Sequence, residues 1–177
     1  MSMKRSVLSI VTVSVIAFTG MNIAIAADGN IKFNGDILET ACKVDTATQK
    51  IVNMGKINKS AFNGPGDLAA PKKFSIILKD CPTSVTSARV TFDGEADMAN
   101  SNLLALNEEG AATGVGLALF ESDGSTPIPV SVLSKAITLD TTASNINTLS
   151  YIAKYMATGP VVAGNGNATT DFTVSYN

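Results

Sequence analysis

Histidine and tryptophan are both absent from the 177 residues. Without an imidazole the chain cannot form a Ser-His-Asp or Cys-His catalytic group, and it has no histidine to bind zinc or copper or to respond to pH. No glycine-rich phosphate loop occurs, and Glu108 and Glu109 do not follow the spacing of an EF-hand calcium loop. The sequence therefore predicts a protein that is not an enzyme and that needs no cofactor or metal.

Basic residues are also few, with 13 Lys and Arg against 15 Asp and Glu, which gives a net charge of −2. No cluster of Lys and Arg follows the first residues of the chain. A nucleic-acid-binding or membrane-surface protein would need such a basic patch. We therefore expect neither nucleic acid nor an anionic membrane as a partner.

The first 26 residues have the pattern of a secretory signal peptide. Lys4 and Arg5 form a positive start, residues 7–20 are apolar, and 24–26 read Ala-Ile-Ala, a small-residue cleavage site. The apolar run is short and no stop-transfer pattern follows it, so we expect cleavage and no membrane insertion afterwards. The mature chain would start at Ala27 and contain roughly 150 residues, enough for one domain with a good core.

Cysteine is scarce, with two residues, Cys42 and Cys81. An even pair in an exported chain predicts one disulfide bond, because exported proteins meet an oxidising compartment. Closing a loop of this size should stabilise the fold by roughly 4 kcal/mol in the chain-entropy description.

Alternation of polar and apolar residues dominates the rest of the chain, whereas helical periodicity is weak. Turn dipeptides such as Asp93-Gly94 and Asp123-Gly124 separate the alternating runs, and we expect Gly159-Pro160 to end the longest one. The pattern predicts an antiparallel β-sandwich. Alternating runs lie at 74–81, 90–92, 115–120, 128–132, 149–155 and 171–176.

Two prolines and two possible helical turns are weaker features of the sequence. Pro127 and Pro129 predict that the strand over 128–132 lies at a sheet edge, because proline has no backbone N–H to donate to a neighbouring strand. Short helical turns are possible at 58–62 and 98–109.

Alternation also reaches both ends of the mature chain. Residues 29–35 alternate between two glycines, and 171–177 alternate up to the last residue, as though the chain stopped within a strand. Strand edges are templates for pairing, and soluble proteins usually cover or charge them. An exported domain of this kind is therefore predicted to pair with another chain.

The chain resembles the pilin subunits of chaperone–usher fimbriae, most closely the type 1-like major subunits. The order of the matching segments and the cysteine spacing carry the resemblance over essentially the whole mature chain. The segments are 29–37, 42–45, 52–55, 74–81, 114–120, 151–155 and 168–177.

The resemblance implies an all-β, incomplete immunoglobulin-like sandwich that lacks its last strand and is completed by a donor strand from a neighbouring subunit. Residues 27–36 would be the N-terminal donor extension and 37–177 the pilin domain. The donor side chains would be Gly29, Ile31 and Phe33.

The last strand would flank the groove that receives the donor strand. Its residues Phe172, Val174, Tyr176 and Asn177 would also contact the chaperone, whose basic side chains would hold the carboxylate of Asn177. The implied partners are a periplasmic pilus chaperone, an outer-membrane usher and neighbouring pilin subunits. The implied location is an adhesive fimbria on the bacterial surface, reached through the periplasm.

Two other functions fit the same residues. A minor or adaptor pilin of the same fibre would share every feature above. A self-complete secreted β-sandwich that binds a carbohydrate or a protein would instead pair its N-terminal strand within its own sheet. The lack of Trp and the presence of only three Tyr count against stacking on sugars.

Overall fold

The structure is a computed structural model, and it describes residues 29, 31–35, 41–45, 51–142 and 144–177. The chain divides into two compact units, Met1–Asp36 and Ile37–Asn177, and each is described by itself. The predicted signal peptide, residues 1–26, lies outside the described residues. In the part of the chain that is described, no helix has the length and apolar character needed to cross a membrane.

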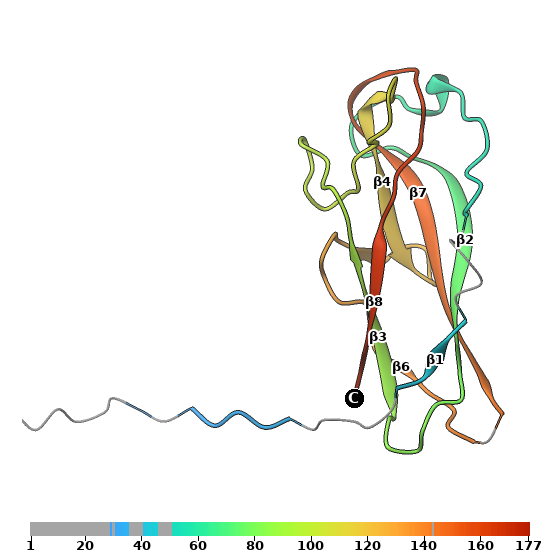
Figure 1. Ribbon diagram of the computed structural model, residues 1–177. Coiled ribbons are helices and arrows are strands. Elements are labelled where there is room, and N and C mark those ends of the chain that lie inside the picture. Colours follow the sequence, from blue (N-terminus) through green and yellow to red (C-terminus); the bar gives the residue numbers. More distant parts are fainter. Residues whose placement is uncertain (1–28, 30, 36–40, 46–50, 143) are drawn as a thin grey trace, which may run out of the picture. The chain divides into compact units, whose positions relative to one another are not determined.

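The regular secondary structure described in the second unit is almost entirely β-strand (Figure 1). A single 3-10 turn, η1 (Lys59–Ala61), is capped by the side chain of Asn58, within the helical turn expected at 58–62. The strands are β1 (Lys43–Val44), β2 (Leu68–Lys79), β3 (Ser87–Asp93), β4 (Thr113–Glu121), β5 (Pro127–Ile128), β6 (Ile137–Thr138), β7 (Ile146–Val162) and β8 (Asp171–Tyr176).

The strands form two sheets, in which every paired neighbour is antiparallel. The larger sheet has the order β1-β2-β7-β4-β5, and the smaller one has the order β6-β3-β8. Figure 1 shows β3 and β8 lying in front of β4 and β7, so the two sheets form two layers. The predicted antiparallel β-sandwich is confirmed.

The core lies between the layers and is filled by alternate residues of the strands. Leu149, Tyr151, Ala153 and Tyr155 alternate along β7 and are all buried, as their spacing predicts. Tyr151 meets Phe92 of the smaller sheet edge to face, with ring centroids 5.1 Å apart. Such contacts between layers fix how the sheets lie over one another.

The predicted strand over 115–120 is confirmed as one covered on both faces. Leu119 joins the main core, whereas Ala118 and Phe120 form a second, smaller cluster with Leu103 on the other face of the larger sheet. A strand with two buried faces accounts for its continuous apolar sequence.

The predicted disulfide is present and joins Cys42 to Cys81. Cys42 directly precedes β1 and Cys81 lies two residues after the end of β2, so the bond ties these two strands together. Both cysteines are buried.

Three sequence-based predictions about elements were wrong. The strand expected over 128–132 stops at Ile128, because Ser131 takes a positive φ of 60° and turns the chain. Gly159-Pro160 does not end the longest strand, since β7 continues to Val162. Residues 98–109 form bends and turns in place of a helical turn.

Candidate functional site

An apolar groove of about 1270 Å³ lies between the two sheets of the second unit. The larger sheet supplies its floor through side chains that alternate along β2, β4 and β7. From the smaller sheet, Phe92 and Phe172 line it. The floor includes Phe74, Ile76, Leu117, Leu119, Ala153 and Tyr155.

The floor of the groove carries no charge. Its polar group, the hydroxyl of Tyr155, donates a hydrogen bond to the carbonyl oxygen of Gly166 at 2.6 Å. Burial raises the pKa of the Tyr155 phenol, so it stays neutral at physiological pH. The charged residues that line the groove, such as Lys56, Glu108 and Asp171, are exposed. The groove is therefore suited to an extended apolar segment.

One side of the groove is formed by β8, whose outer edge pairs with no strand among the described residues. β8 is bonded on its other side to β3, from Ala88↔Tyr176 to Asp93↔Asp171. Its edge therefore presents backbone groups that a further strand could pair with.

The hydrogen bonds at the end of β8 show which residues present those groups. Asn177 and Ser87 exchange two backbone hydrogen bonds, at 3.0 and 3.1 Å. In an antiparallel ladder such pairs alternate with pairs that direct their N–H and C=O groups outward. Phe172, Val174 and Tyr176 therefore direct their backbone groups toward the free edge.

The outer side of β3 supports the same assignment. The carbonyl oxygens of Val90 and Phe92 accept from the N–H groups of Ser134 and Ser131, both at 2.8 Å. Val90 and Phe92 are the ladder partners of Val174 and Phe172, so their backbone groups point away from β8.

The other sheet edges are protected against pairing. In β2, the register with β7 shifts between Ala69 and Lys72, and Pro71, Lys72 and Lys73 are all exposed. β1, β5 and β6 are only two residues long, and β5 starts with a proline. Bulges, prolines, lysines and short strands are the usual means of blocking edge pairing. β8 has six residues and none of these features.

The residues predicted for the last strand lie along this edge. Val174 and Tyr176 pack against the main core, and Phe172 lines the groove. The backbone oxygen of Asn177 accepts from the N–H of Thr86 at 2.7 Å and from its hydroxyl at 2.9 Å. Gly29, Ile31 and Phe33 belong to the first unit, where Ile31 is 79% and Phe33 89% exposed.

Sequence reasoning missed the residues that complete the groove. Residues 51–57 line it, and Met54 packs against the main core although this segment forms no strand. Its alternation of exposed and half-buried positions, with Val52 and Met54 half-buried, is the signal that could have identified it. Among the described residues, no group of three acidic, Cys or His side chains is placed to hold a metal ion.

Comparisons with known proteins agree with this architecture. The family model described as "Fimbrial protein" matches residues 31–177. The chain is 37% identical to long polar fimbria protein A of Salmonella typhimurium over 178 residues, covering 98% of this chain and 97% of that protein.

Solved structures also match. The antigen and type I fimbria protein BPSL1626 of Burkholderia pseudomallei is 38% identical, with a TM-score of 0.60, and the match covers 78% of this chain and 91% of that one. The P pilus rod subunit PapA shares the fold, with 21% identity and a TM-score of 0.63 over 78% of this chain and all (100%) of that one. The chain thus belongs to the fimbrial protein family, and it is a structural subunit of a fimbria on the cell surface.

Proposed function

We propose that this pilin polymerises by donor-strand exchange, in which residues 27–36 of one subunit fill the groove of the next. The observation that carries the proposal is the unprotected edge of β8 beside an apolar groove. An extended segment laid along that edge would pair with the backbone groups of Phe172, Val174 and Tyr176. This is strand addition, in which backbone hydrogen bonds supply affinity and alternate side chains supply specificity.

The donor segment has side chains that suit the groove. Gly29, Ile31 and Phe33 alternate, so all three would face the groove floor when the segment is extended. Burying Ile31 and Phe33 would contribute about 1.5–3 kcal/mol each. Gly29 would fit where the groove is too shallow for a side chain, and Lys32 would face solvent.

The same groove explains the need for transient partners. A subunit whose groove is open exposes apolar surface, which promotes aggregation. A periplasmic chaperone would fill the groove first, with its basic side chains on the carboxylate of Asn177, and an outer-membrane usher would host the exchange. Each subunit would then donate to one neighbour and accept from another, a head-to-tail contact that propagates as a filament.

The test replaces one donor residue and one control residue with the same charged side chain. Ile31→Asp would place a carboxylate in an apolar slot at a cost of several kcal/mol, which applies only on assembly. Lys32→Asp introduces the same side chain at the adjacent position, which would face solvent. The level of oxidised subunit in the periplasm and the yield of sheared surface filaments are measured for both variants.

We expect Ile31→Asp to reach the periplasm at normal levels and to form few or no filaments, whereas Lys32→Asp forms filaments normally. Phe33→Asp should behave as Ile31→Asp does. If Ile31→Asp removes folded subunit itself, residue 31 belongs to its own domain's core and the chain is a self-complete sandwich. Normal filaments from Ile31→Asp would also overturn the proposal.

A further inference from the structure

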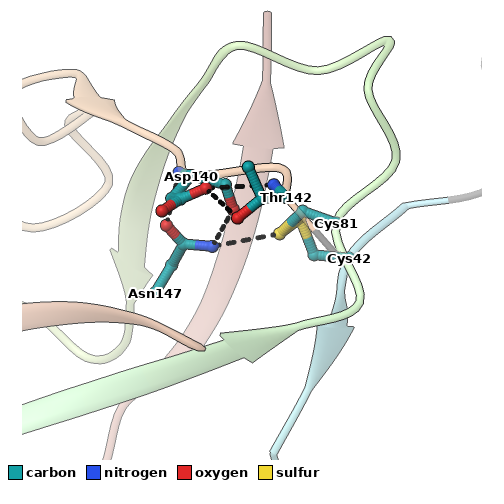
Figure 2. The surroundings of a disulfide bond; sticks show 5 residues. All are labelled: Cys42, Cys81, Asp140, Thr142 and Asn147. Carbon is teal, nitrogen blue, oxygen red and sulfur yellow. Dashed lines mark hydrogen bonds between the residues drawn. A yellow bond between two sulfur atoms is a disulfide. The ribbon is translucent and has the colours of Figure 1, made fainter. Parts of the chain in front are cut away.

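Of the two disulfide sulfur atoms, that of Cys81 accepts a side-chain hydrogen bond within the described part of the chain. The side-chain nitrogen of Asn147 donates a hydrogen bond to Sγ of Cys81, with 3.6 Å between the two atoms. Figure 2 shows Asn147 beside the disulfide, with this bond drawn to the sulfur of Cys81. Asn147 is 8% exposed, so water competes little for its amide.

Asp140 determines how this amide is oriented. The side-chain oxygen of Asn147 accepts from the backbone N–H of Asp140 at 2.7 Å, and its nitrogen donates to the backbone oxygen of Asp140 at 2.9 Å. Reversing the amide would set donor against donor and acceptor against acceptor. The remaining N–H of Asn147 is therefore held toward Cys81.

The charged groups near the disulfide are already engaged with one another. Lys43 pairs with Asp80 at 2.9 Å, and Lys79 pairs with Asp45 at 2.6 Å. The carboxylate of Asp140 accepts from the N–H and hydroxyl of Thr142. Within the part of the chain that the structure describes, the side-chain N–H of Asn147 is thus the donor placed to stabilise negative charge on a disulfide sulfur.

The two cysteines also differ in how firmly their surroundings hold them. Cys42 precedes β1, a two-residue edge strand that pairs with β2 through Lys43↔Lys79 and Val44↔Leu78, and one further backbone hydrogen bond joins Asp45 to Ile77. Cys81 follows the 12-residue β2, which is paired with β7 over most of its length. Short edge strands open at a lower free energy than central ones. Local opening of β1 would therefore expose Cys42 while Cys81 stays beside Asn147.

We propose that Asn147 is a positioning residue that makes Cys81 the sulfur that attacks when this disulfide closes and that leaves when it is reduced. The thiolate, and not the thiol, attacks in disulfide exchange, and a thiol with a lower pKa also leaves faster. A hydrogen bond donated to the charged form favours that form. Asn147 would give this advantage to Cys81 and not to Cys42.

The closing step follows from this assignment, with a dithiol–disulfide oxidant as co-reactant. The thiolate of Cys42 first attacks the oxidant's disulfide and forms a mixed disulfide, releasing one oxidant thiolate. The thiolate of Cys81 then attacks Sγ of Cys42, the bond from Cys42 to the oxidant breaks, and the second oxidant thiolate leaves. The oxidant gains two electrons and the two protons. In reduction, a thiolate attacks Sγ of Cys42, and Cys81 leaves as a thiolate that accepts from Asn147.

The test identifies which sulfur is attacked in the oxidised, folded chain. The protein is treated briefly with glutathione, quenched with iodoacetamide, and mapped by mass spectrometry. We expect glutathione on Cys42 and the alkyl group on Cys81. Equal labelling, or glutathione mainly on Cys81, would overturn the proposal without the need for any variant.

Three variants separate the hydrogen bond from packing. Asn147→Ala should reduce the preference for Cys42 about five- to tenfold, the factor expected of one hydrogen bond. Asn147→Asp keeps an oxygen for the N–H of Asp140 but loses the donor, and it should reduce the preference at least as much. Asn145→Ala is the matched control, because the Asn145 amide donates to Thr142 in the same turn. An equal loss of preference in Asn145→Ala would assign the effect to packing of the turn and reject the proposal.

Discussion

Gly114 is the residue that leaves space for Pro160 in the neighbouring strand β7. It lies in β4 with a φ of +70°, and a side chain on it would clash with the carbonyl oxygen of Pro160. The register between β4 and β7 shifts beside Gly114, between Thr113 and Val115. Proline is tolerated in sheets at such irregularities because no ladder hydrogen bond is required there. The long strand therefore passes through Gly159-Pro160.

We expect Gly114→Ala to destabilise the fold by about 2 kcal/mol or more, because alanine disfavours the left-handed conformation and its methyl group has no space. Gly64→Ala is the control, since a side chain there meets no atom within 4 Å and no left-handed conformation is required. Thermal unfolding of the two variants is the measurement. Equal melting temperatures would contradict this account of the bulge.

The disulfide gives a second prediction at the residue scale. Replacing Cys42 or Cys81 with Ser should cost roughly 2–5 kcal/mol and deplete the folded subunit in the periplasm. Both native cysteines should resist thiol labelling, since they are joined in a disulfide bond and are buried. Mutant subunit present at the wild-type level would refute the prediction.

At the scale of the elements, β2 and β8 differ in whether their sequences block pairing with a further strand. β2 has a register shift in its pairing with β7, and beside it a proline and two exposed lysines, whereas β8 has none of these. The contrast separates an edge that must not pair from one that is free to pair.

Removing the protection of β2 should create a second pairing edge. Replacing Pro71, Lys72 and Lys73 by Val, Thr and Val leaves the core unchanged, because all three positions are exposed. We expect the variant subunit to form oligomers and aggregates during size-exclusion chromatography. The same three residues placed at the exposed positions 59–61, in the 3-10 turn η1, serve as the control and should leave the elution unchanged. Monomeric behaviour of the β2 variant would argue that this edge is blocked by other means.

On the scale of the whole molecule, the sandwich is unequal in its two layers. The larger sheet has five strands and the smaller has three, so part of the larger sheet's inner face lines the groove. Apolar surface left in a groove contributes less to stability than the same surface covered by a strand. A strand added beside β8 would cover it.

Appending a copy of residues 27–36 after Asn177 through a flexible linker should therefore stabilise the subunit. Two buried apolar side chains at about 1.5–3 kcal/mol each correspond to an increase in melting temperature on the order of 10 °C. The control carries Asp at both the Ile31 and Phe33 positions of the appended copy and should show no increase. If the active copy gives no increase either, the groove is not a donor-strand site.

Much of the fold could be predicted from local patterns. Alternation identified the buried faces of β2, β3, β4 and β7, and the two cysteines in an exported chain identified the disulfide. The groove was predicted only through resemblance to a family, and the contribution of residues 51–57 was missed. The ends of strands were the least predictable, as Ile128 and Pro160 show, because they depend on neighbours distant in sequence.

The sequence by itself determined which side chains of each strand face the core, since the period of two is a property of the extended backbone. It also determined that no imidazole chemistry is available. Only the tertiary structure decided which strand edge stays open, because pairing joins residues far apart in the chain, such as Arg89 and Ser175. The tertiary structure also decided that Asn147 donates a hydrogen bond to Cys81 and that the carbonyl group of Pro160 lies against Gly114. No local sequence pattern encodes such contacts between distant parts of the chain.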